Sequence, residues 1–480
     1  MIVTRFAPSP TGYMHIGNLR TALYSYLISK HEDGKFILRI EDTDRERFVE
    51  GATDIIKSTL SITGLGYDEG PDVGGDHGPY VQSERKEIYM EYAKKLVDMG
   101  YAYYCFCTKD RLEKLHEEDA TGGYDRHCRN LSPEEVQRNL DAGIPFVIRQ
   151  KMPLEGTTSY VDSVFGEISM NNSELQDQIL MKADGYPTYN FCHVIDDHLM
   201  GVTHVVRGSE YLTSTPKYVL LYDAYGWERP TYVHLPLIMG RNEDGSISKL
   251  SKRHGAVSFQ DLIADGYLPE AVVNYLALLG WCPKNSETEF FTLDELKSVF
   301  TIDGVSKSPS VFDYEKLLWF NGEYIHKLSP EKFEELVTPF IKCEIPSTVN
   351  KARMLELLRT RITKLSEINE RMAFFISLPD YERELFLNKK NKISDFELVK
   401  TVLTSALDIL SATDSFDNDT LFAGLTPLTE SLGLKTGTIM WCIRIAVSGM
   451  TATPGGATEI MEVIGKDESI ARIKAAISKL

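Results

Sequence analysis

The sequence of 480 residues has no apolar run that approaches the roughly 20 residues needed for a membrane-spanning helix. It also lacks a charged and then apolar leader at its start, and an Arg- and Ser-rich presequence. Its seven cysteines are few and odd in number, which favours reduced thiols over a disulfide framework. We therefore expect a cytoplasmic protein that does not bind a membrane.

Basic residues are scarce relative to acidic ones. The chain has 52 Lys and Arg against 70 Asp and Glu, which gives a formal net charge of −18. This balance weakens the case for a nucleic-acid-binding protein but does not exclude it, because such binding depends on local basic surface. With 42% hydrophobic and 25% charged residues, the composition is that of a globular protein with two to four domains.

The P-loop pattern GxxxxGK[ST] is also missing. Residues 8–20 nevertheless read PSPTGYMHIGNLR, after the strand-like run IVTRFA. Helical spacing predicts a helix from about Asn18, with Asn18 as its N-cap. The start of a helix attracts anions, His15 stands just ahead of it, and Gly17 lets a ligand approach the backbone. The stretch therefore predicts a polyphosphate site.

Four regions follow from the changes of pattern along the chain. Residues 1–82 and 189–245 alternate strands and helices, as in βαβ units on a parallel sheet. Residues 83–188 between them have the pattern of an α+β insertion. Residues 246–325 turn helical after a basic loop, and residues 326–480 have a helical pattern almost throughout.

A second candidate for an anion site is the loop SISKLSKRHG at residues 246–255. It gathers Lys249, Lys252, Arg253 and His254 among small and hydroxyl residues. Such a cluster is more often a solvated basic turn. Paired with the turn at His15, however, it fits in-line attack on a triphosphate, in which one segment holds the nucleotide and the other neutralises the departing pyrophosphate.

The segments MHIGN and KLSKR resemble the HIGH and KMSKS motifs of class I aminoacyl-tRNA synthetases. In order along the chain, RFAPSPTGYMHIGNLRTAL, LRIEDTD, DGYPTYNF, VVRGSEYLTSTPK and KLSKRHGAV resemble the bacterial type of the glutamyl-tRNA synthetase family. The resemblance implies a Rossmann-type catalytic domain, an inserted acceptor-end-binding domain, a stem-contact helical domain with the KLSKR loop and an all-helical anticodon-binding domain. Asn18 replaces the last histidine of HIGH, which shifts the phosphate role to His15, the backbone and Lys252.

Site residues follow from the resemblance together with chemistry. The implied catalytic residues are His15, Lys249 and Lys252. The implied glutamate-binding residues are Arg5, Ala7, Ser9, Glu41, Tyr189, His193 and Arg207, and the implied ATP-binding residues are Thr11, His15, Gly17, Asn18, Glu210 and Lys252.

Within this set, Arg5 and Arg207 would bind carboxylates through their guanidinium forks and Glu41 would face the amino group. Without the resemblance, the two arginines would be assigned to ordinary ion pairs. His193 falls where relatives often carry asparagine, so its contact with the substrate is an open question.

The insertion also contains a candidate metal site. Relatives often bind zinc here through three cysteines, which in this chain match Cys105, Cys107 and Cys128, and a fourth ligand that varies. Asn130 stands where some relatives have histidine, so Tyr124 or, less favoured, His127 would be that ligand. The alternative is three reduced thiols in an aromatic-rich neighbourhood, because the spacing is not one of the strong zinc patterns.

The resemblance implies activation of L-glutamate with ATP and Mg²⁺ to glutamyl adenylate, followed by transfer to the 3′ end of tRNA(Glu) and release of AMP and pyrophosphate. It also implies that activation waits for tRNA, and it leaves open whether tRNA(Gln) is charged. We expect a monomer. Two rivals are a truncated paralogue that modifies a tRNA base and a catalytically silent binding protein. The long helical tail argues against the first, and the presence of His15 and Lys252 argues against the second.

Overall fold

The computed structural model describes residues 1–44, 46–118, 123–255, 258–284 and 287–480. It divides the chain into two compact units. The first unit comprises Met1–Leu262 and Val272–Asp313, and the second comprises Ile263–Ala271 and Tyr314–Leu480.

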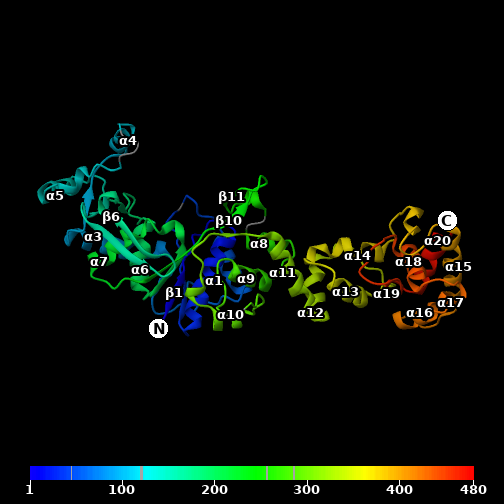
Figure 1. The fold of residues 1–480 in the computed structure, drawn as a ribbon. Coiled ribbons are helices and arrows are strands. Elements are labelled where there is room, and N and C mark those ends of the chain that lie inside the picture. The colour runs from blue at the N-terminus through cyan, green and yellow to red at the C-terminus, as the bar shows by residue number, and fades with distance from the viewer. Residues whose placement is uncertain (45, 119–122, 256–257, 285–286) are drawn as a thin grey trace. The chain divides into compact units, whose positions relative to one another are not determined.

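Parallel strands form the centre of the first unit (Figure 1). The strands are β2 (Lys35–Leu38), β1 (Val3–Phe6), β8 (His204–Gly208) and β9 (Thr231–Leu235). β1 pairs with β2, and β8 pairs with β9. β1 also lies beside β8, where the Thr203 N–H donates to the Val3 carbonyl over 2.9 Å. The carboxyl ends of these strands therefore meet at one edge of the sheet.

An antiparallel hairpin extends this sheet beyond β9. It consists of β5 (Thr157–Asp162) and β6 (Gly166–Asn171), and β5 runs parallel to β9 with Asp162 opposite Tyr232. The hairpin lies within the predicted insertion, residues 83–188, and is nevertheless part of the central sheet.

Helices pack on this sheet because the strands carry apolar side chains. α1 (Ile16–His31) and α7 (Thr215–Tyr225) lie against it, whereas α3 (Lys86–Asp98) and α6 (Tyr189–Leu199) pack on the strands of the insertion. α2 (Ala52–Ile62) follows β2 along the chain. α1 is buried along most of its length, and Leu19, Leu23 and Leu27 are completely inaccessible to solvent. Its buried Ser25 and Ser29 direct their hydroxyls to carbonyls of the same helix, which satisfies them inside the core.

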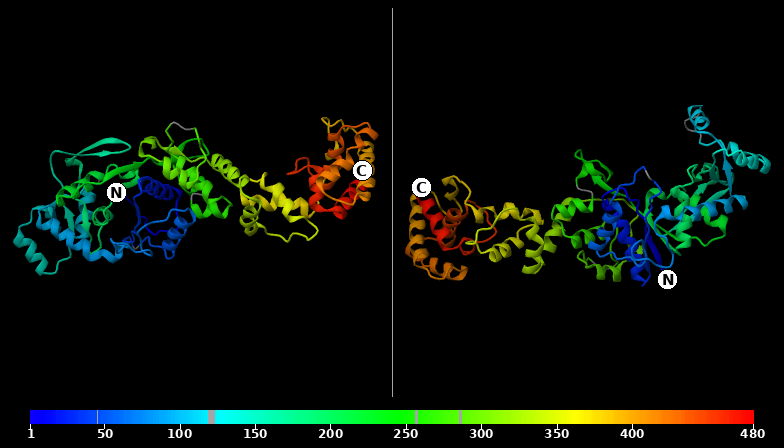
Figure 2. Two further views of the ribbon diagram at one scale, coloured as in Figure 1. Left: turned by 90° about the horizontal axis from the view of Figure 1, so that it is seen from below. Right: turned by 180° about the vertical axis from the view of Figure 1, so that it is seen from behind.

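The rest of the insertion forms a small α+β body. Its sheet has the order β3 (Ala102–Cys105), β4 (Val147–Gln150), β7 (Ile179–Met181). Two further helices, α4 (Lys109–Glu118) and α5 (Pro133–Asp141), extend away from the central sheet (right-hand view of Figure 2). A capping box between Ser132 and Glu135 fixes the start of α5.

The remaining part of the first unit carries the basic loop. β10 (Ile238–Arg241) pairs antiparallel with β11 (Ile247–Lys249) and parallel with β12 (Ser310–Val311). The helices here are α8 (Phe259–Ala264), α9 (Pro269–Leu278) and α10 (Leu293–Val299). The end of α8 and the start of α9 belong to the segment Ile263–Ala271 of the second unit. The hairpin places Lys249 at the end of β11, directly before the loop that continues to Gly255.

The second unit is helical. Its helices are α11 (Tyr314–His326), α12 (Pro330–Val337), α13 (Lys351–Arg359), α14 (Ile368–Ile376), α15 (Phe396–Ala412), α16 (Asn418–Leu425), α17 (Leu428–Ser431), α18 (Thr436–Ser448), α19 (Ala457–Ile464) and α20 (Lys466–Lys479). Side-chain caps begin several of them, as Ser329 does for α12 and Asp395 for α15. The helical spacing around residues 350–376 corresponds to two helices, α13 and α14, whose apolar positions enter one core.

These observations confirm the predicted fold class, an α/β region with a parallel sheet and an α+β insertion, followed by a helical region. Within the described residues, every helix is either too short or too polar to cross a bilayer.

Candidate active site

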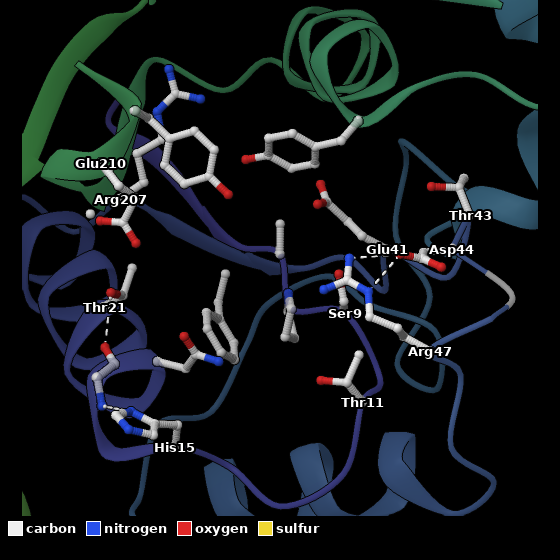
Figure 3. A pocket seen from close by; sticks show the side chains of 18 of the residues that line it. Ser9, Thr11, His15, Thr21, Glu41, Thr43, Asp44, Arg47, Arg207 and Glu210 are labelled. Carbon is white, nitrogen blue, oxygen red and sulfur yellow. Dashed lines mark hydrogen bonds and ion pairs between the residues drawn. The ribbon is translucent and has the colours of Figure 1, made fainter. Parts of the chain in front are cut away.

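A pocket of about 1330 Å³ opens at the edge where the parallel strands end. β1 leads into Ser9, β2 into Glu41, and β8 carries Arg207 near its end. Figure 3 shows Arg207 and Glu210 on one side of the pocket and Glu41 on the other, with Ser9 and Thr11 below Glu41. The carboxyl edge of a parallel sheet is the usual ligand position in such folds.

Most of the site residues predicted from the sequence border this one pocket. They are Arg5, Ala7, Ser9, Thr11, His15, Gly17, Asn18, Glu41, Tyr189, Arg207, Glu210 and Lys249. Two are exceptions. His193 lies behind the wall, and the side chain of Lys252 lies outside the part of the chain that the structure describes.

His15 is the N-cap of α1, which corrects the expectation that Asn18 has this role. The Nδ1 atom of His15 accepts the Gly17 N–H over 3.0 Å, and the helix begins at Ile16. Asn18 is already inside the first turn, where its N–H donates to the His15 carbonyl. A Cβ at Gly17 would lie 3.1 Å from Nδ1, so the absence of a side chain keeps this contact relaxed.

The protonation of His15 follows from that contact. Burial, and then the charge of Lys249, lower the pKa of the imidazole. The neutral ring accepts at Nδ1 and therefore carries its proton on Nε2. His15 is thus a hydrogen-bond donor at the pocket, which suits an anionic ligand.

Arg207 is a buried cation without an acidic partner. Only 4% of its surface is exposed, and among the described residues no carboxylate lies within ion-pair distance of it. Its three nitrogens donate to neutral acceptors: Nε to His234 Nε2 (3.3 Å), Nη1 to His193 Nε2 (3.1 Å) and Nη2 to Thr215 Oγ1 (3.0 Å). The ring centroids of Tyr211 and Tyr218 lie 5.0 and 4.7 Å from the guanidinium carbon, but no ion pair within the described residues neutralises its charge at the pocket wall.

Arg5 differs because its charge is balanced. Its Nε donates to Asp197 Oδ1 over 2.9 Å, so the ion-pair interpretation holds for this arginine. Asp197 also binds Arg39 over 2.8 Å, and the neighbouring charges hold the pKa of the buried Asp197 carboxyl below its usual value. Arg5 nevertheless borders the pocket, and its Nη2 makes no hydrogen bond to the described residues.

Glu41 presents one oxygen to the protein and one to the pocket. Oε1 accepts from Arg39 (3.0 Å) and from Gln82 (3.3 Å). The described residues donate no hydrogen bond to Oε2. Burial raises the pKa of Glu41, and the charges of Arg39 and Arg5 oppose this rise. An ammonium group in the pocket would bind well at the second oxygen.

His193 contacts the pocket only through its neighbours. The imidazole is 98% buried and stacks on Tyr189, with ring centroids 4.9 Å apart. Its Nδ1 lies 2.9 Å from the Tyr189 carbonyl, and its Nε2 faces Arg207. The structure therefore places His193 against Arg207, behind the residues that line the pocket.

The basic loop reaches the same pocket as His15. Lys249 lies 3.9 Å from Glu210, and Leu250 and Ser251 line the wall beyond it. His254 anchors the loop, because its Nδ1 accepts the Ser251 N–H over 3.0 Å. Segments 15–18 and 249–251, far apart in the sequence, thus border one cavity.

Several lining residues were not predicted. Thr43, Asp44 and Arg47 follow Glu41, and Tyr186 and Tyr211 stand beside Tyr189 and Glu210. The signal was available for four of them, because Thr43 and Asp44 lie in EDTD, Tyr186 in DGYPTY and Tyr211 in GSEY, which carry predicted residues. Thr215 lies in VVRGSEYLTSTPK, which also carries predicted residues, whereas nothing in the sequence pointed to His234.

The cysteines of the insertion also come together. The Sγ atoms of Cys105, Cys107 and Cys128 lie within 4.8 Å of one another. The Tyr124 hydroxyl lies 3.2 Å from Cys105 Sγ and 3.7 Å from Cys107 Sγ, whereas the His127 side chain makes no hydrogen bond in the described structure.

Two family models match the chain. The model described as tRNA synthetases class I (E and Q), catalytic domain, covers residues 1–319, and the model of an anticodon binding domain covers residues 332–477. The glutamate–tRNA ligase of Clostridium tetani is 55% identical to this chain, with 100% of the chain and 98% of the relative aligned. The enzyme of Clostridium novyi is 54% identical, with 99% and 98% aligned.

Among solved structures, the glutamate tRNA ligase of Elizabethkingia meningosepticum, crystallised in complex with its amino acid, matches with a TM-score of 0.91 and 36% identity. The match covers 100% of this chain and 99% of that one. These likenesses extend over both units, and the matched catalytic model contains every residue that lines the pocket. The chain therefore belongs to the glutamate–tRNA ligase family of class I tRNA synthetases.

Proposed function

We propose that this protein activates L-glutamate with ATP and transfers it to the 3′ end of tRNA(Glu). The neutral surroundings of Arg207 are the main observation that supports glutamate as the amino acid. A buried guanidinium surrounded by neutral acceptors needs an anion, and the ligand must supply it. The side-chain carboxylate of glutamate meets that need, because a guanidinium binds a carboxylate through two parallel hydrogen bonds.

The main-chain groups of glutamate fit the opposite wall. The ammonium would donate to the Glu41 oxygen that faces the pocket, and Arg5 would donate from Nη2 to the α-carboxylate. Ser9 and Tyr189 border the space between these charges. This set of contacts orients the α-carboxylate for reaction.

The chemistry needs no side-chain nucleophile. The α-carboxylate of glutamate attacks the α-phosphorus of ATP, the bond to the β-phosphate oxygen breaks, and pyrophosphate leaves. His15 would donate from Nε2 to a phosphate oxygen, while Lys249 and Lys252 would neutralise charge on the departing pyrophosphate. Glu210 would border the adenosine end. In the second step a terminal ribose hydroxyl of the tRNA attacks the acyl carbon, and AMP leaves.

Magnesium enters this proposal with ATP. Mg²⁺ binds phosphate oxygens and keeps several waters, so it needs few protein ligands. The ion would be held by the triphosphate and by water, and by no residue of the chain.

The four cysteine and tyrosine side chains of the insertion fit zinc. A tetrahedral ion with bonds of about 2.3 Å holds its sulfurs about 3.8 Å apart, and Cys107 Sγ lies 3.6 Å from Cys128 Sγ. Tyr124 rather than His127 would be the fourth ligand, because its hydroxyl lies among the sulfurs. Zinc would supply a structural link between β3 and residues 124–128.

The helical unit would bind the anticodon region of tRNA, as the anticodon-domain match supports. The chain would act as a monomer in the cytoplasm, where its tRNA substrate is charged.

Exchange of labelled pyrophosphate into ATP tests the proposal. We expect exchange with glutamate only when tRNA(Glu) is present, and none with glutamine. Failure of exchange under every condition would rule out the ligase activity. The same preparation, assayed for charging of tRNA(Gln), measures whether that tRNA is a second substrate.

A further inference from the structure

Arg207 lies in a row of three residues on adjacent strands of the central sheet. β5 carries Asp162, β9 carries His234 and β8 carries Arg207, and the strands are neighbours in the order β5–β9–β8. Arg207 and His234 are direct cross-strand partners. Asp162, His234 and Arg207 are each at most 4% exposed. The sheet register thus fixes all three side chains relative to one another.

We propose that Asp162 and His234 form a positioning pair that aims the Arg207 guanidinium at the carboxylate of the amino-acid substrate. This inference rests on the proposed function of the pocket. Neither residue borders the pocket, so both act through Arg207 and are positioning residues.

The pair works by fixing the position of one proton. Asp162 Oδ2 lies 2.7 Å from His234 Nδ1 and also accepts the His234 backbone N–H over 3.1 Å. An ionised carboxylate only accepts, so Nδ1 carries the proton of the neutral ring. The lone pair of Nε2 then faces the Arg207 Nε–H over 3.3 Å. Reversal of the ring tautomer would place two donors against each other.

The orientation of Asp162 is itself fixed by the chain. Its Oδ1 accepts the N–H groups of Val164 (2.9 Å) and Phe165 (2.8 Å), which belong to the turn between β5 and β6. The hairpin therefore holds the carboxylate, the carboxylate holds the imidazole, and the imidazole holds the guanidinium.

The other two acceptors follow the same rule. The Nδ1–H of His193 donates to the Tyr189 carbonyl, so that its Nε2 accepts from Arg207. The Thr215 hydroxyl donates to the Tyr211 carbonyl over 2.8 Å and accepts from Arg207. Each acceptor is neutral and is locked by a second hydrogen bond.

Two N–H groups of the Arg207 guanidinium remain for a ligand. A guanidinium has five N–H groups, and three are used by His234, His193 and Thr215. One N–H remains on each terminal nitrogen, which matches the two oxygens of a carboxylate. Because none of these three acceptors is charged, none of them competes with the ligand's carboxylate for an ion pair with Arg207.

Asp162→Asn is the first test, because it keeps the shape and removes the fixed acceptor. An amide at this position donates to Nδ1 and favours the wrong imidazole tautomer, as is known for buried acid–histidine pairs in hydrolases. We expect the KM for glutamate in tRNA charging to rise at least tenfold, with the KM for ATP within twofold and kcat within threefold of the wild-type values.

The matched control is Glu69→Gln. Glu69 is a buried carboxylate that lies 2.8 Å from His77 Nδ1, and it does not border the pocket. This variant should leave the KM for glutamate unchanged even if it lowers the melting temperature. Equal effects of both substitutions on the KM for glutamate would show a general structural role and would overturn the proposal.

A double-mutant cycle provides the second test. His234→Gln keeps an acceptor towards Arg207 that depends on no ring tautomer. In that background Asp162→Asn should add less than a twofold change in the KM for glutamate. Additive effects, or a single Asp162→Asn variant with unchanged KM, would contradict the proposal. If Asp162→Asn does not fold, His234→Leu takes its place, because it removes the acceptor towards Arg207. A KM for glutamate that changes less than threefold in His234→Leu would then contradict the proposal. A wild-type protein without glutamate activation would instead refute the proposed function.

Discussion

The Nδ1 atom of His15 lies 3.0 Å from the backbone nitrogen of Gly17, so a single imidazole begins a helix and also faces the pocket. Its two nitrogens have separate tasks. One accepts from the helix, and the other carries the proton that a phosphate would accept. A structural contribution and a catalytic contribution of this residue should therefore be separable by substitution.

His15→Asn and His15→Ala separate them. Asparagine is a good N-cap, whereas alanine lacks an acceptor and should lower the free energy of unfolding by about 1 kcal/mol. Both variants lack the Nε2–H, and we expect each to reduce glutamate-dependent pyrophosphate exchange at least tenfold. Urea unfolding and the exchange assay measure the two effects. An asparagine variant with wild-type exchange would remove the phosphate role.

Arg207→Lys keeps the charge and loses the fork. An ammonium cannot serve three fixed acceptors and a carboxylate at once, so we expect the KM for glutamate to rise about 100-fold. The control is Arg229→Lys, which changes an exposed arginine paired with Asp223 away from the pocket. Steady-state charging kinetics decide the matter, and equal KM values for both variants would argue against carboxylate binding at Arg207.

Lys252→Ala tests the role of the basic loop at the departing pyrophosphate. For Lys252 this role is predicted from the sequence alone. Loss of a cation that stabilises the departing pyrophosphate should lower kcat about 100- to 1000-fold. Binding of tRNA, measured by filter retention, should not change. Lys284→Ala serves as the control, because Lys284 pairs with Asp303 outside the pocket. Unchanged turnover of Lys252→Ala would show that the role is misassigned.

If the cysteine cluster binds zinc, elemental analysis of the purified protein should find one zinc ion per chain. Cys128→Ser should lose the ion and lower the melting temperature, whereas Cys343→Ser, at an exposed thiol elsewhere, should do neither. Tyr124→Phe should keep the ring contact with Arg149 and bind the metal more weakly, because it lacks the hydroxyl. Metal-free wild-type protein, purified without chelators, would favour three plain thiols.

Acid should destabilise the protein through His193 and His234. Burial lowers the pKa of both imidazoles and the charge of Arg207 lowers both further, while the hydrogen bond with Asp162 partly opposes the fall in the pKa of His234. The unfolded chain therefore takes up protons below about pH 6.5 that the native state does not take up. Stability is complete above that pH and falls below it, by up to about 1.4 kcal/mol per pH unit for each ring. His193→Asn should reduce this slope in urea unfolding between pH 7.5 and 5.5, and an unchanged slope would contradict the assignment.

The sequence was most informative where the chemistry lies in contiguous segments. The strand before Ala7, the turn at His15 and the loop at Lys249 are short and distinctive, and all three border the pocket. The N-cap of α1 was misplaced by three residues, because asparagine is the commoner cap and the histidine cap depends on a glycine two residues later. Local propensity cannot foresee that contact.

What the sequence could not show depends on strand pairing. Asp162 and His234 are 72 positions apart, and neither stands in a motif. Their relation arises only when β5 joins β9. Similarly, the sequence left Tyr124 and, less favoured, His127 as candidates for the fourth ligand, and the fold of the loop places the tyrosine hydroxyl among the sulfurs.

The hairpin of residues 157–171 sets a lower limit for engineering a minimal catalytic fragment. It belongs by position to the inserted region, yet it provides an edge of the central sheet and the carboxylate beneath Arg207. A trimmed protein that discards residues 83–188 as one block would lose that carboxylate together with the rest of the insertion. A deletion within the insertion should therefore end before residue 157, so that the hairpin and Asp162 are kept beneath Arg207.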